Sequence, residues 1–172
     1  MRMMRKRIVT LAAAFVLAFS AVAAAAGVTQ INSDDHVLQS TEIALGGIMV
    51  GTPRSEVEAI YGAPTERTEP VKSAAMDEMM DTYTYGTSFQ VIFVKDMAMF
   101  IISTAHNGIA TPAGVTVGDP ADAVMRTYGK PHRYSRSESG NESFVYLDPY
   151  GIAIVFSAEG GSITRIGIVG YE

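Results

Sequence analysis

The sequence of 172 residues contains no cysteine and no tryptophan. Without cysteine the fold must be stable without disulfides, and both thiol catalysis and cysteine-based metal sites are excluded. Only three histidines are present, and His36, His106 and His132 lack the spacing of a metal site or a catalytic triad. The motifs of nucleophile elbows, zinc-binding helices and phosphate loops are also missing. We therefore predict that the protein is not an enzyme and has no catalytic residues, no metal-ligating residues and no cofactor.

The first 26 residues have the pattern of a signal peptide. A basic region with Arg2, Arg5, Lys6 and Arg7 precedes an apolar run over residues 8–22, and alanines fill positions 23–26. The run is short for a membrane span, and no lipid-modified cysteine can follow it. We predict cleavage near Ala26, no membrane span afterwards, and export to the periplasm or the medium.

The remaining chain has few positive charges. Nine basic residues stand against 18 acidic ones after position 26, which is a formal net charge of −9. Such a balance disfavours nucleic acid and anionic membrane surfaces as partners, because both carry negative charge.

One passage occurs twice, 67 residues apart. Residues 47–64 align without a gap with residues 114–131, and eight of the 18 positions are identical. A repeat indicates that both copies solve the same packing problem. We divide the chain into the signal peptide (1–26), a lead-in (27–46), repeat 1 (47–105), a connector (106–113) and repeat 2 (114–172).

Each copy is expected to begin with a short helix. Thr52 and Asp119 are predicted N-caps, each followed by a proline at the first helical position. Gly62 and Gly129 are the expected left-handed residues at the helix ends. A helix of about ten residues is not stable alone, so it must pack on a sheet.

Runs rich in aromatic and β-branched residues predict the strands of that sheet. The expected strands are Asp81–Tyr85, Ser88–Val94, Met97–Thr104, Ser143–Leu147, Tyr150–Phe156 and Ser162–Val169, and Val37–Leu45 is interpreted as a further strand. Tight turns are expected at Lys95-Asp96 and around Gly160-Gly161. The predicted fold class is α+β, with two tandem repeats that each pack a short helix on an antiparallel meander of three to four strands.

The repeat signature resembles two families of small exported proteins. Gly51, Val57, Gly62 and Pro64, with their counterparts Gly118, Val124, Gly129 and Pro131, are similar to the α+β unit of outer-membrane assembly lipoproteins of the SmpA/OmlA type and of the β-lactamase-inhibitor-protein type. The chain differs from the first type in having two units and no lipobox cysteine, and from the second in lacking disulfide cysteines. The resemblance implies that the protein binds another protein through its sheet face and loops.

The copies differ most between the helix and the first strand. From the proline to the strand tyrosine, repeat 1 spans six residues more than repeat 2, and the excess falls in Glu66–Asp81. Insertions of this kind are typical of exposed loops that carry specificity. The predicted partner-binding residues come from this segment and from the strand aromatics: Met76, Met79, Met80, Tyr83, Tyr85, Tyr146 and Tyr150.

Two classes of function remain open for these residues. The first is a non-catalytic protein-binding module, of which an enzyme inhibitor is a special case. The alternative is a copper or small-ligand binder, because the thioethers of Met76, Met79 and Met80 are soft ligands. The oligomeric state is not predicted.

Overall fold

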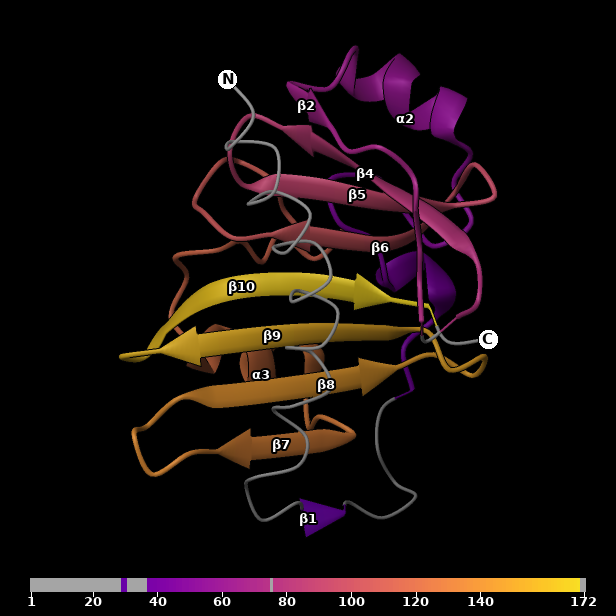
Figure 1. The fold of residues 1–172 in the computed structure, drawn as a ribbon. Helices are drawn as coiled ribbons and strands as arrows, with labels where there is room; N and C mark the ends of the chain where they lie inside the picture. Colours follow the sequence, from indigo (N-terminus) through magenta and orange to yellow (C-terminus); the bar gives the residue numbers. More distant parts are fainter. Residues whose placement is uncertain (1–28, 31–36, 75, 171–172) are drawn as a thin grey trace.

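The computed structural model describes residues 29–30, 37–74 and 76–170 (Figure 1). The predicted signal peptide and His36 lie outside these ranges. The elements in chain order are β1 (Thr29–Gln30), the 3₁₀ helix η1 (Ser40–Glu42), α2 (Arg54–Tyr61), β2 (Glu66–Arg67), β3 (Val71–Lys72), β4 (Met79–Tyr85), β5 (Phe89–Val94), β6 (Met97–Ser103), α3 (Asp122–Tyr128), β7 (Arg133–Arg136), β8 (Glu142–Leu147), β9 (Ala153–Glu159) and β10 (Ser162–Val169). Within these described ranges, an antiparallel sheet with two short α-helices confirms the predicted α+β class.

The strands of the described chain form one sheet rather than two. Their order is β1-β7-β8-β9-β10-β6-β5-β4-β2, with β3 beside β4. At the centre β6 pairs with β10, where Ile101 lies opposite Ile168. The lead-in contributes β1, which pairs with β7 at one edge of the sheet. The three-stranded meanders β4–β5–β6 and β8–β9–β10 are therefore joined, and each face of the sheet runs across both of them.

The predicted strands and turns are mostly found in place. β10 covers Ser162–Val169 as expected, and Lys95 and Asp96 have the positive φ angles, 50° and 63°, of a tight hairpin turn. The strand predicted at Tyr150–Phe156 is displaced, since β9 runs from Ala153 to Glu159. The segment before it forms a loop that hydrogen bonds to Asp148 hold in place.

The predicted helix caps are wrong. Thr52 Oγ1 accepts a hydrogen bond from the N–H of Met49, and Asp119 Oδ2 accepts one from the N–H of Thr116, three residues earlier in each case. Each side chain therefore closes the preceding turn instead of the helix. The helices begin later, at Arg54 and Asp122, with Pro53 and Ala121 as flanking residues.

The predicted helix ends are found at the two glycines. Gly62 and Gly129 share a φ of 73°, and their N–H groups donate to the carbonyls of Glu58 and Met125. An L-residue with a side chain rarely adopts this φ, which explains the glycine.

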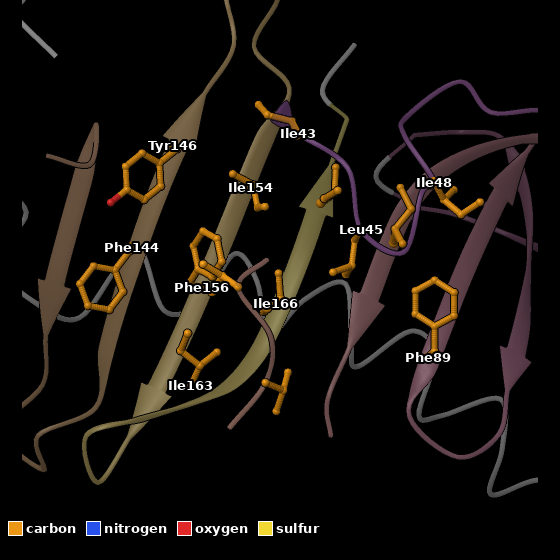
Figure 2. Packing of buried hydrophobic residues seen from close by; sticks show 14 of the residues in the cluster. Ile43, Leu45, Ile48, Phe89, Phe144, Tyr146, Ile154, Phe156, Ile163 and Ile166 are labelled. Carbon is orange, nitrogen blue, oxygen red and sulfur yellow. The ribbon is translucent and has the colours of Figure 1, made fainter. Parts of the chain in front are cut away.

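The segment Val37–Leu45, expected as a strand, instead contains η1. The spacing of its apolar residues allows a compact turn to bury them on one side. Leu38, Ile43 and Leu45 are each 1% exposed or less. Figure 2 shows Ile43 and Leu45 lying over the sheet side chains. The segment thus covers the core, which a strand at this place would not do.

The sheet has two faces of different character. On the first face, the face of Phe89, Val91 and Phe93, the main core packs side chains of α2, α3 and the segment before α2 against the strands. On the second face a smaller cluster contains Met80, Ile92, Val94 and Ile102, with Val71, Met76, Met99 and Phe100 packed against it. No helical residue of the described chain belongs to this second cluster.

Two strand tyrosines, Tyr85 and Tyr146, differ in their hydrogen bonds. Tyr146 Oη donates to the carbonyl of Gly129 at 2.8 Å. The hydroxyl of Tyr85 is buried and has no partner among the described residues. Burial raises the pKa of Tyr85 to about 12, so the hydroxyl stays protonated and its donor is left unsatisfied.

We expect Tyr146→Phe to lower the free energy of unfolding by about 1 kcal/mol, because it removes a hydrogen bond and leaves a carbonyl unpaired. Tyr85→Phe serves as the matched variant and should be neutral or slightly stabilising, because it removes an unpaired buried hydroxyl. Urea unfolding followed by circular dichroism measures both. Equal losses in the two variants would contradict the unsatisfied state of Tyr85.

Candidate functional site

Exposed apolar side chains gather at one end of the sheet. Seven large apolar residues are exposed in the described chain, and two of them, Ile60 and Met125, lie on the helices. The other five are Val37, Met49, Met79, Met97 and Tyr150. We call these five residues the apolar end of the sheet.

Strand register places three of the five at the same end. Met79 and Met97 are the first residues of β4 and β6, and β5 between them ends at Val94, which lies opposite Met80 and Met97. Tyr150 lies between β8 and β9, whose Leu147 and Ala153 pair with one another. Ala153 in turn lies opposite Val169 of β10. This is the right-hand side of Figure 1, where β8 and β10 end.

Hydrogen bonds bring the remaining two residues to this end. The N–H of Leu38, next to Val37, donates to the carbonyl of Leu147. Near Met49, the backbone of Gly51 and Thr52 exchanges hydrogen bonds with Ala98 at the beginning of β6. Segments far apart in the sequence thus place exposed apolar residues at the same end of the sheet.

A rigid loop presents Tyr150. Asp148 Oδ1 accepts hydrogen bonds from the N–H groups of Tyr150 and Ile152, both at 2.8 Å, and Oδ2 accepts one from Ser40 Oγ at 2.7 Å. Asp148 itself is only 4% exposed, whereas Tyr150 is 81% exposed. The backbone is therefore held while the aromatic ring extends into solvent.

The predicted methionine cluster is divided by the sheet. Met79 and Met80 are neighbours in β4, so their side chains point to opposite faces. Met80 is buried in the second-face cluster with Met76 packed against it, and Met79 is exposed. Three thioethers that do not converge favour packing and surface contact over a shared copper ion.

The sequence predicted that the six-residue excess in Glu66–Asp81 forms an exposed loop. In the structure, part of this segment forms strands. β2 and β3 within it pair with β4, through Arg67 opposite Tyr83 and Val71 opposite Met80. The excess therefore extends the sheet edge, and the turn after β3 brings Met76 onto the second face.

The tyrosines Tyr83, Tyr85 and Tyr146, which were also predicted to bind a partner, lie in the core. Tyr83 and Tyr146 are 3% and 0% exposed, and Tyr85 is half-buried against Tyr61 and Phe89. Their rings pack under the helices on the first face. Of the predicted set, Met79 and Tyr150 reach the surface of the apolar end. Sequence reasoning missed Val37, Met49 and Met97, which no motif distinguishes from core residues.

Charged side chains surround the β4–β6 part of the apolar end. Lys72 pairs with Asp77 and Lys95 pairs with Glu78, all close to Met79 in the chain or across the hairpin. An apolar centre with a charged margin is typical of protein-binding surfaces.

The histidines of the described chain bind backbone groups. His106 Nδ1 lies 2.8 Å from the carbonyl oxygen of Val117, and His132 Nδ1 accepts the N–H of Leu147. In the described ranges no three His, Asp or Glu side chains are placed to hold a metal ion. In the same ranges no helix has the length and hydropathy to cross a membrane.

Comparisons with known proteins show only distant likeness. No protein-family model and no curated protein matches the chain. An extracellular protein containing a SCP domain from Bacillus anthracis str. Ames shares 8% identity over 81% of this chain and 49% of that chain, with a TM-score of 0.47. A DUF4309 family protein (YjgB) from Bacillus subtilis subsp. subtilis str. 168 shares 16% identity over 73% of this chain and 83% of that chain, with a TM-score of 0.42.

This chain spans about half the length of the first of these structures. Neither structure is described as a β-lactamase-inhibitor or SmpA/OmlA-type protein, so the resemblance to those families rests on the sequence motif alone.

Proposed function

We propose that this chain is an exported, non-catalytic protein-binding module that contacts its partner through the apolar end of the sheet. The observation that carries the proposal is Tyr150, which is 81% exposed on a loop held by Asp148. A residue whose backbone is already held loses less conformational freedom on binding, and tyrosine is enriched among residues that dominate binding energy.

The dimensions and composition of the apolar end suit one interface. Five strand spacings separate β8 from β4, or about 24 Å, which fits within a standard interface of roughly 800 Å² per partner. Met49, Met79 and Met97 add flexible side chains that adapt to a partner around Tyr150. An inhibitor of an exported enzyme is a special case of this function.

We also infer that the two halves are one structural unit used twice, in keeping with the sequence repeat. Support comes from matched hydrogen bonds: Gly51 N–H donates to Ala98 O, and Gly118 N–H donates to Ile163 O. The binding residues come from positions where the halves differ. Tyr150 lies in the five-residue connection 148–152, whereas the corresponding connection between β4 and β5 has three residues, 86–88, and no aromatic.

The exported protein, immobilised as bait, should capture a partner from the envelope or extracellular fraction. We expect Tyr150→Ala to weaken that binding by at least tenfold, because it removes the exposed anchor. Met97→Ala should weaken binding less, because a flexible side chain contributes less. Quantitative binding to the captured partner measures both changes.

Met125→Ala is the matched control. Met125 is 41% exposed on α3 and Met97 is 45% exposed at the apolar end, so the two substitutions remove the same side chain at similar exposure. The control should bind like the wild type. Equal binding by all variants, or no capture above background, would exclude the proposed surface.

A further inference from the structure

The second face of the sheet carries one largely apolar cross-strand row and one mixed row beside it. Register aligns Leu147, Ala153, Val169, Phe100, Ile92 and Thr82 into one row from β8 to β4. The adjacent row contains Val145, Val155, Gly167, Ile102, Gln90 and Thr84. Arg133 of β7 and Glu66 of β2 extend this adjacent row at its two ends.

No described helix covers this face. Ile92 and Ile102 are 2% and 4% exposed in the full chain, and the described residues packed against their cluster, Val71, Met76, Met99 and Phe100, all lie in strands or turns. The cleavage near Ala26 that the sequence predicts would remove the apolar run over residues 8–22. The residues that follow up to position 36 include only Val28 and Ile31 as large apolar side chains, too few to shield a six-strand surface.

The second face is complementary to itself. A twofold axis parallel to the strands, at the boundary between β6 and β10, superposes β7 of one copy on β2 of the other. Ile102 then faces Gly167 of the second copy and Ile92 faces Ala153, and at these two positions a large side chain meets a small one. The same operation places Phe100 opposite Val169 and Gln90 opposite Val155. The same operation brings Glu66 opposite Arg133. Both are exposed, and neither makes an ion pair within the described residues.

The area approaches what a standard interface buries. Seven strand spacings separate β7 from β2, or about 34 Å, and strands of six residues are about 20 Å long, which gives at most roughly 680 Å² per copy. Standard interfaces bury about 800 Å² per partner. Aligned packing of two sheets face to face is also a common arrangement.

We propose that the mature protein forms a twofold dimer through the second face of its sheet, with Glu66 of each copy paired to Arg133 of the other. Because the twofold axis is parallel to the strands, each strand of the second copy runs in the same direction as the strand of the first copy that it comes from. The apolar ends of both copies therefore lie at the same end of the dimer. The dimer therefore presents two partner-binding surfaces side by side. Its formation does not depend on what those surfaces bind.

Sedimentation equilibrium of the exported protein, with its N-terminus determined by mass spectrometry, tests the proposal. The wild type should be a dimer. Glu66→Arg and Arg133→Glu should each raise the dissociation constant about tenfold, because each replaces two symmetry-related attractions by repulsions. The double variant Glu66→Arg/Arg133→Glu should return toward the wild-type value, because opposite charges face one another again.

Glu56→Arg is the control, since Glu56 is exposed on α2 and lies away from the second face. It should leave the dissociation constant unchanged. A cleaved wild type that stays monomeric would overturn the proposal, as would a double variant as weak as the single ones. If the exported protein retained residues 8–22 and were a monomer, that segment rather than a second copy would cover the face. This result would also overturn the proposal. A monomer that still binds the captured partner through Tyr150 would leave the proposed function intact.

Discussion

Asp81→Asn is expected to lower the free energy of unfolding by about 3 kcal/mol, because it leaves a partly buried guanidinium without its counter-ion. Arg54 donates from Nη1 and Nη2 to the two carboxylate oxygens of Asp81 at 2.8 and 2.7 Å. The side chains are 17% and 7% exposed, so water replaces little of the lost interaction. This ion pair connects the first residue of α2 to β4.

Packing prevents Arg54 from relocating. Its guanidinium carbon lies 4.2 Å from the ring centroid of Phe93 and 4.7 Å from that of Tyr83. The hydrogen bonds to Asp81 also raise the pKa of Arg54, so the side chain does not lose its charge. Asp96 remains as a partner, but it is 82% exposed and its interaction is screened by solvent.

Urea unfolding followed by circular dichroism measures the effect. Asp122→Asn is the control, because Asp122 and Arg126 form an exposed pair on α3 that contributes only about 0.3–0.5 kcal/mol. The double variant Arg54→Met/Asp81→Leu should recover most of the loss, since apolar groups of similar size replace a buried ion pair at little cost. If Asp81→Asn were as mild as Asp122→Asn, the ion pair would not hold α2 to the sheet.

The sequence predicted the elements better than their long-range contacts. Alternation and turn residues were sufficient to place β10 and the Lys95-Asp96 turn, because both are determined by neighbouring residues. The pair Arg54–Asp81 joins residues 27 apart, and no local pattern indicates it. The caps failed for a related reason, because Thr52 and Asp119 have a competing N–H donor within the preceding turn.

The candidate site was predictable only in part. Tyr83 and Tyr85 alternate with Thr82 and Thr84, but β5 beside them is apolar on both faces, so the sequence could not assign the buried face. Tyr150 is exposed because Asp148 accepts two backbone N–H groups and delays the beginning of β9 to Ala153. The sequence, which places apolar residues from Tyr150 onward, favoured a strand there.

Phe156→Ala is expected to lower the free energy of unfolding by about 4 kcal/mol, because the ring is fully buried and its removal leaves a cavity. Its ring packs 5.3 Å from the centroid of Tyr128 and 6.1 Å from that of Tyr146. Figure 2 shows it between the side chains of β8 and β10. Thermal unfolding measured by circular dichroism should show a clear fall in the midpoint.

Val91→Ala provides the control in the other half. Val91 lies opposite Tyr83 as Phe156 lies opposite Phe144, and it is equally buried. Two residues further along the strands, Phe93 lies opposite Asp81 and Ala158 lies opposite Glu142, so the large rings of β5 and β9 lie at different points of the register. Removing the smaller valine side chain should cost about half as much as removing the phenylalanine ring, since the cost increases with cavity volume. Equal losses in the two variants would contradict a cost that is set by the volume of the cavity.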